Sequence, residues 1–194
     1  MEKFKKEIPF LAIALIPFAY LIYIWNRLPE KVPMHWNGAG EIDRYGDKKE
    51  LVAMLCMLVG ITYFVFLIIP YVKKKKKLQN MGNKLNNLRM ILTLFMSGLA
   101  VFILYSVQQK SSNPGFVFAI IGLLFAFLGN YFKTIKPNYF IGIRTPWTLE
   151  NEEVWKKTHV LGGKLWFIGG LLMALTFLLP NEMQLYIFLG ITAV

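Results

Sequence analysis

The chain has 194 residues, of which 56% are hydrophobic and 17% are charged, and its formal net charge at pH 7 is +11. A soluble domain of this length needs more polar surface than this composition supplies, and long apolar runs are typical of membrane-spanning helices. In a membrane protein, excess Lys and Arg indicates loops that face the cytoplasm. The composition therefore excludes an ordinary soluble domain, and we expect no direct nucleic-acid binding.

Apolar runs in chain order predict an all-α integral membrane protein, a polytopic helical bundle of about six spans. The runs cover residues 8–25, 51–72, 88–107, 116–132, 164–179 and 185–194. A full crossing needs about 20 residues. The last run is shorter, so it either borrows residues before Leu185 or is truncated in this sequence. Cys56 lies inside the second run, and we expect a buried structural thiol there.

The pattern divides the chain into three parts. Residues 1–72 form an N-terminal unit of two spans, and residues 73–87 form a basic linker that begins with five lysines. Residues 88–194 form a C-terminal unit. With the N-terminus in the cytoplasm, most of the 22 lysines and arginines fall on the cytoplasmic side, in agreement with the positive-inside rule.

A polar loop, residues 26–50, separates the first two spans and faces outward in this topology. Its aromatic residues and turn signals predict an ordered loop. Its candidate ligand-binding residues are His35, Trp36, Asn37, Gly38 and Asp43. The alternative is that these residues hold the loop together, with Asn37 and Gly38 forming a turn. His35 has no second His or Cys beside it, so we expect no metal site.

A second polar segment, residues 136–149, lies between the fourth and fifth spans and faces the cytoplasm. Prolines disfavour helix just before them, and Gly142 permits backbone angles that other residues resist. Its candidate partner-binding or structural residues are Asn138, Tyr139, Gly142, Arg144, Thr145, Pro146 and Trp147. The planar guanidinium of Arg144 suits fixed recognition. The alternatives for Arg144 are an ion pair with Glu152 or Glu153, or capping of helix-end carbonyls.

Residues 149–161 predict a short helix along the membrane surface, capped by Thr145 or Thr148 and followed by a break or close contact at Gly162 and Gly163. Glu152, Glu153 and His159 resemble the start of a Glu-Glu-x-x-x-Arg motif of prenyl-protein-type intramembrane proteases. Lys157 replaces the Arg, and no further His follows. We therefore expect no enzyme activity and no cofactor.

Two blocks of the sequence resemble one known family. Residues 138–149, Asn-Tyr-Phe-Ile-Gly-Ile-Arg-Thr-Pro-Trp-Thr-Leu, followed by Val154-Trp155 and Thr158-His159, resemble the signature of the SdpI family of bacterial membrane immunity proteins. The outer loop resembles the domain of unknown function at the N-terminus of that family. The residues of this second block are Leu28-Pro29, Val32-Pro33, His35-Trp36-Asn37, Gly40, Asp43 and Lys48.

The resemblance implies a non-enzymatic protein of the bacterial cytoplasmic membrane that gives resistance to a secreted antimicrobial peptide toxin. It also implies a receptor that holds a winged-helix autorepressor at the membrane. We expect the outer loop to meet the toxin, the inner segment to meet the repressor, and the five lysines to attract anionic membrane lipids. The alternative is a membrane enzyme or transporter for a lipid-soluble molecule. A polar cavity between His35 and Arg144, or from either to lipid, would favour it.

Overall fold

The computed structural model describes residues 2–37, 41–69, 83–110, 114–139 and 141–193. Its helices are α1 (Glu2–Ile24), α2 (Glu50–Leu55), α3 (Ile61–Ile68), α5 (Asn83–Gln109), α6 (Pro114–Phe132), α7 (Pro146–Glu150), α8 (Glu152–Leu175) and α9 (Asn181–Thr192). Shorter helical turns are η1 (Trp25–Arg27), η2 (Cys56–Gly60) and η4 (Thr176–Leu178). Two strands, β1 (Lys31–Trp36) and β2 (Ile42–Asp47), complete the described elements.

Five helical segments are long and apolar enough to cross a membrane, which confirms the predicted polytopic bundle. They are Glu7–Arg27, Glu50–Ile68, Lys84–Gln109, Gly115–Phe132 and Glu152–Leu178. The sixth apolar helix, α9, has 12 residues and begins at Asn181, four positions before the predicted run. The chain is therefore a multi-pass membrane protein with one short additional helix.

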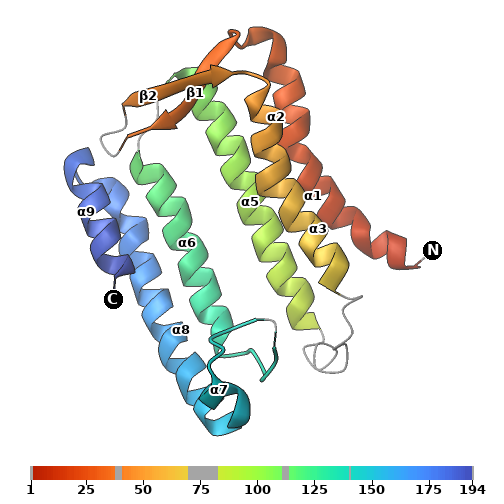
Figure 1. Ribbon diagram of the computed structural model, residues 1–194, viewed down its shortest axis with the longest axis vertical. Coiled ribbons are helices and arrows are strands. Elements are labelled where there is room, and N and C mark those ends of the chain that lie inside the picture. The colour runs from red at the N-terminus through yellow and green to blue at the C-terminus, as the bar shows by residue number, and fades with distance from the viewer. Residues whose placement is uncertain (1, 38–40, 70–82, 111–113, 140, 194) are drawn as a thin grey trace.

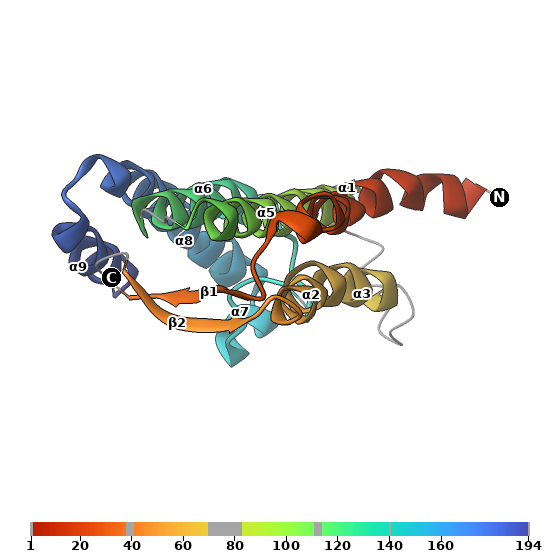
Figure 2. The same cartoon turned by 90° about the horizontal axis from the view of Figure 1, so that it is seen from above.

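The long helices run beside one another, with the hairpin across one end of the bundle and α7 at the other (Figure 1). Seen from above, α1, α5 and α6 form a row, and α2, α3 and both strands lie on the same side of it (Figure 2). The bundle thus has a hairpin end and an α7 end. Most of the predicted basic linker lies outside the described residues, and its last part, from Asn83, is the first turn of α5.

The loop between the first two spans is ordered, as predicted, but it contains an antiparallel β-hairpin that the sequence did not indicate. Lys31 pairs with Asp47, Val32 with Gly46, and the register shifts between Pro33 and Trp36. Proline cannot donate a ladder hydrogen bond and is tolerated at sheet edges and bulges. Pro33 therefore makes the sequence of β1 look unlike a strand, although the hairpin still forms.

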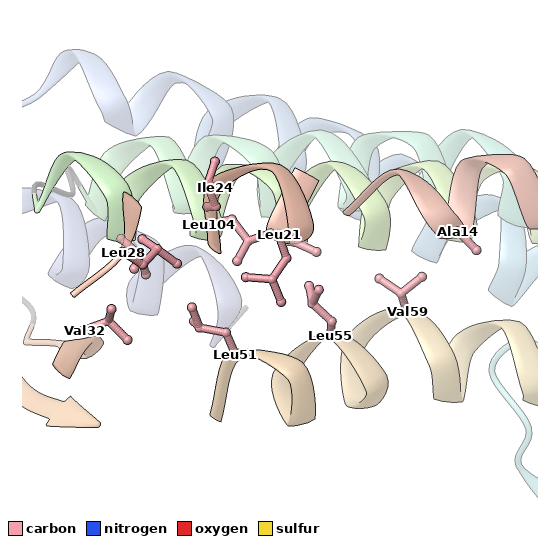
Figure 3. Packing of buried hydrophobic residues seen from close by; sticks show 11 residues of the cluster. Ala14, Leu21, Ile24, Leu28, Val32, Leu51, Leu55, Val59 and Leu104 are labelled. Atoms are coloured by element: carbon pink, nitrogen blue, oxygen red, sulfur yellow. The ribbon is translucent and has the colours of Figure 1, made fainter. Parts of the chain in front are cut away.

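The hydrophobic core at the hairpin end joins α1, α2, α5 and β1. Ile24, Val32, Leu51, Leu55 and Leu104 are each 0% exposed. In Figure 3 these side chains lie together, with Val32 of β1 beside Leu51 of α2. Close packing of these side chains against one another therefore fixes the hairpin on the helices.

The segment after α7 corrects the predicted short helix and bears out the close contact at Gly163. The expected short surface helix over residues 149–161 is divided between two helices: Leu149 and Glu150 end α7, and α8 begins at Glu152 and continues without a break to Leu175. Gly162 and Gly163 do not interrupt it, and Gly163 is instead the close contact that was the other alternative, because α6 packs directly against α8 there. A Cβ atom on Gly163 would lie 2.6 Å from the Gly129 carbonyl oxygen.

The expectation of a buried Cys56 in the second span is wrong, since this residue is exposed.

Candidate functional site

The base of the hairpin is held by both burial and charge. Leu28, just before β1, is 6% exposed and packs in the same cluster as Val32. The Lys48 Nζ lies 2.7 Å from Glu30 Oε1, and it also lies 5.1 Å from the centre of the Trp25 ring. Opposite charges on the two arms therefore close the hairpin near the helices.

His35 and Asp43, both singled out from the sequence, contact each other across the two strands. His35 Nδ1 lies 2.6 Å from Asp43 Oδ1, and the two side chains are 65% and 43% exposed. With a proton on Nδ1, the ring donates to the carboxylate. Nε2 is then the ring nitrogen that can accept a hydrogen bond.

Asn37 closes the tip of the hairpin, which is the structural role considered for it. Its Nδ2 donates to Glu41 Oε2 at 2.9 Å, and its Oδ1 accepts from the Glu41 backbone N–H at 3.0 Å. Its own backbone N–H donates to the Glu41 carbonyl at 2.9 Å. Gly38 lies outside the described residues.

A pocket of about 490 Å³ opens beneath the hairpin and collects three of the predicted residues, His35, Trp36 and Asn37. The indole Nε1 of Trp36 is buried and has no hydrogen-bond partner among the described residues. Asp43 does not line the pocket and acts on it through His35. The remaining lining residues are Met34, Met54, Phe102, Ile103, Ser106, Val117, Phe118 and Leu185.

Sequence reasoning missed most of the pocket wall. Apart from Met34 of β1, those residues come from α2, α5, α6 and α9, and nearly all of them are apolar side chains inside predicted spans. Such positions cannot be told from lipid-facing ones by hydrophobicity. Among them only Ser106, a polar residue that is 4% exposed, could have suggested from the sequence that its position lines a pocket.

At the opposite end, the segment between α6 and α7 is organised by its own polar groups. We call residues 133–145 the connector. Asn138, which is 1% exposed, donates to the carbonyls of Lys136 and Ile141 at 2.8 and 3.1 Å. Its Oδ1 accepts from the Ile141 backbone N–H at 2.8 Å. Asn138 therefore shapes the connector from inside and is not exposed to a partner.

The connector is fastened to α8 by Trp155 and His159, and the sequence did not predict this role. The Trp155 indole N–H donates to the Ile135 carbonyl at 2.8 Å. The Ile143 backbone N–H donates to His159 Nε2 at 3.0 Å, while His159 Nδ1 lies 2.8 Å from the Trp155 carbonyl. This pattern requires a neutral ring with its proton on Nδ1.

Gly142 lies where the connector passes over His159. Its φ is +113°, and a Cβ atom there would lie 2.3 Å from His159 Nε2. Both the backbone angle and the space therefore demand glycine. The expectation that Gly142 relieves a strained backbone agrees with this geometry.

Arg144 is exposed and bonds the connector itself. Its Nη1 donates to the Tyr139 carbonyl at 2.6 Å. The alternative ion pair with Glu152 or Glu153 does not form among the described residues, and Glu153 pairs instead with Lys157 at 2.8 Å. Arg144 thus fixes one turn of the connector and keeps much of its guanidinium accessible.

Thr145 and Thr148 form a reciprocal cap at the start of α7, whereas α8, which contains most of the predicted 149–161 helix, is capped by Asn151. The Thr148 backbone N–H donates to Thr145 Oγ1, and the Thr145 backbone N–H donates to Thr148 Oγ1. Pro146 occupies the first turn, where its missing N–H costs no hydrogen bond. Trp147 is 63% exposed. Tyr139, Arg144 and Trp147 are therefore exposed candidate residues of this region.

The chemistry of these residues gives little support to a metal or a catalytic centre. Among the described residues, no group of three or more His, Cys, Asp or Glu side chains could hold a metal ion. Both ring nitrogens of His159 are occupied by backbone groups. The pocket at His35 has no lining residue from the connector. The continuous polar cavity that would favour an enzyme or transporter is therefore not formed by this pocket.

A partly buried ion pair is the other feature that sequence reasoning missed. Arg89 of α5 donates from Nη1 and Nη2 to the Glu7 carboxylate of α1, at 2.8 and 2.5 Å. The Arg89 guanidinium also lies 4.0 Å from the centre of the Phe10 ring. Both charges stand at the edges of predicted spans, so they look like ordinary boundary residues in the sequence.

Comparisons with known proteins give matches over both ends of the chain. Residues 134–194 match the SdpI/YfhL protein family, and residues 12–60 match a domain of unknown function (DUF1648). The chain is 27% identical over 180 residues to Immunity protein SdpI of Bacillus subtilis strain 168, covering 92% of this chain and 84% of that protein. It is 39% identical over 59 residues to an uncharacterized protein of Archaeoglobus fulgidus, covering 30% of this chain and 31% of that protein. No solved structure matches it.

These matches include both structural features described above. The first region contains the connector from Thr134, α7, Trp155 and His159, and the second contains the hairpin with His35, Trp36 and Asn37. The SdpI homologue extends over nearly the whole chain, so the two regions occur together in one relative. The resemblance noted in the sequence is thereby confirmed: residues 134–194 match the SdpI/YfhL protein family.

Proposed function

We propose that this protein is an immunity protein of the bacterial cytoplasmic membrane that protects its cell from a secreted antimicrobial peptide toxin. The observation that carries the proposal is the pocket in which His35, Trp36 and Asn37 meet α5, α6 and α9. The homology to a protein named for immunity supports this role. The hairpin end faces outward in this proposal, where a secreted peptide would arrive.

The pocket suits an apolar side chain of a peptide with a polar group beside it. Phe102, Val117 and Phe118 supply an apolar wall. The unpartnered Trp36 Nε1 offers a buried donor, and a buried donor without a partner costs about 1–3 kcal/mol. A peptide carbonyl that accepts from this N–H would recover that cost. Binding then combines apolar burial with one directed hydrogen bond.

A growth assay tests the immunity role. A bacterial strain sensitive to the toxin that SdpI counters would be challenged with that toxin, with and without this protein. We expect protection by the wild type and its loss in Trp36→Ala and Phe118→Ala at unchanged membrane abundance. Tyr45→Ala is the matched control, because Tyr45 is 58% exposed on the same hairpin and does not line the pocket. Equal protection by all variants would contradict a role for the pocket.

The second half of the proposal is capture of a winged-helix repressor at the α7 end. Tyr139, Arg144 and Trp147 would form the contact surface, because they are exposed residues of the connector and α7, lie in the family signature, and carry polar or aromatic side chains suited to a protein contact. In Arg144→Lys, the single hydrogen bond to Tyr139 can be replaced, but planar bidentate recognition cannot. We expect this variant to weaken signalling to a reporter gene more than immunity. If the variant kept both signalling and immunity in full, the role left for Arg144 would be its contribution to membrane topology.

A further inference from the structure

A groove of about 370 Å³ runs between α6 and α8 near the α7 end of the bundle. Its floor is the close contact of Gly129 with Gly163, where the two backbones approach too closely for any side chain. Its rim carries Lys133, Lys164 and Asn130. Val160 and Phe167, which are 36% and 41% exposed, complete the wall with apolar surface.

The two lysines lie at one level of the bundle. Lys133 directly follows the end of α6 at Phe132, and Lys164 adjoins Gly163, which contacts α6 one turn before that end. A lysine at the end of a spanning helix extends its charge to the lipid headgroups while its carbon chain stays in apolar surroundings. Both ammonium groups therefore reach the headgroup region beside the same groove.

The charges on this groove have one sign. Neither lysine forms an ion pair within the described part of the chain, where the acidic side chains pair with other residues or lie elsewhere. No acidic residue belongs to the lining. Asn130 adds an amide that can donate to a phosphate oxygen. The groove thus combines two cations, one amide donor and an apolar wall.

We propose that this groove binds one anionic phospholipid, with its phosphate between Lys133 and Lys164 and an acyl chain along Val160 and Phe167. Basic pockets between spanning helices bind anionic headgroups, with about 1 kcal/mol contributed by each lysine near the surface, which corresponds to roughly fivefold in affinity. The apolar wall distinguishes a lipid from a free phosphate, which has no acyl chain to place there. The proposal does not depend on the immunity function.

Native mass spectrometry of the purified full chain in detergent tests it, with phosphatidylglycerol and phosphatidylcholine of identical acyl chains as probes. We expect preferential binding of phosphatidylglycerol, weakened about tenfold or more in Lys133→Gln/Lys164→Gln and retained in Lys133→Arg/Lys164→Arg. The matched control is Lys136→Gln/Lys156→Gln. It removes the same charge from two exposed lysines of the same region that do not line the groove.

Each contrary result overturns the proposal. An equal loss in the control pair would assign the preference to general charge attraction, and an unchanged affinity in the groove pair would remove the site. Glycerol phosphate should not compete at concentrations where phosphatidylglycerol is bound. Equal competition by this chainless anion would show a phosphate site without a role for lipid.

Discussion

At the scale of single residues, His159 links two parts of the chain through backbone groups alone. Its Nε2 accepts from Ile143 and its Nδ1 lies against the Trp155 carbonyl, while its ring stacks on the Trp155 indole at 4.0 Å between centres. A histidine in a membrane helix invites a catalytic or metal-binding interpretation. Here the imidazole stabilises the path of the connector, because both of its polar atoms are already used.

A substitution at Gly142 tests the contact between the connector and His159 most directly. Gly142→Ala places a Cβ atom against the His159 ring at a backbone angle that alanine resists. We expect a loss of stability of about 2 kcal/mol or more, seen as a lower melting temperature of the detergent-solubilised protein. Gly98→Ala is the control, since nothing lies within 4 Å of a Cβ atom at that helical position. Equal melting temperatures for the two variants would contradict the contact.

At the scale of elements, the sequence predicted the spans well because run length alone decides whether a helix can cross a bilayer. The sequence was a poor guide where a contact between distant parts of the chain determines the structure. From the sequence, Gly162 and Gly163 could mark a break or a close contact, and only the α6 backbone beside Gly163 shows that it is a close contact in a continuous α8. Pro33 and two short polar strands gave no clear signal of the hairpin. The pocket wall remained hidden for the same reason, since its apolar residues look like lipid-facing ones.

The Glu7–Arg89 pair joins α1 to α5 near the α7 end. This pairing explains why two charged side chains at the edges of predicted spans point into the bundle. Removing one partner of a fully buried pair costs about 3–5 kcal/mol. Glu7 keeps 30% of its side chain exposed. We therefore expect a smaller loss, about 1–3 kcal/mol, for Glu7→Gln or Arg89→Gln. The double variant should lose less than the sum of the single losses, measured by thermal unfolding in detergent. Strict additivity would show that the two residues act independently.

At the scale of the whole molecule, the two helices that wall the pocket also reach the connector end. Phe102 of α5 and Phe118 of α6 line the pocket. At the other end, Tyr131 of α6 donates to the Lys84 carbonyl of α5, and Lys84 Nζ donates to the Thr134 carbonyl at 2.5 Å. Both proposed binding surfaces therefore rest on the same helix pair. A receptor that reports an outer ligand on its inner face needs such shared elements.

This arrangement requires the hairpin and α7 to lie on opposite sides of the membrane. Single cysteines at Tyr45 and Trp147 test it, because these side chains are 58% and 63% exposed and neither label is limited by burial. The exposed Cys56 is first replaced by Ser. A membrane-impermeant maleimide added to intact cells should label Tyr45→Cys and not Trp147→Cys, while both should react after the membrane is permeabilised. The charge distribution favours this orientation because most basic residues then lie inside. Labelling of Trp147→Cys alone in intact cells would invert the topology and move the proposed toxin pocket to the cytoplasmic side, where a secreted peptide could not reach it.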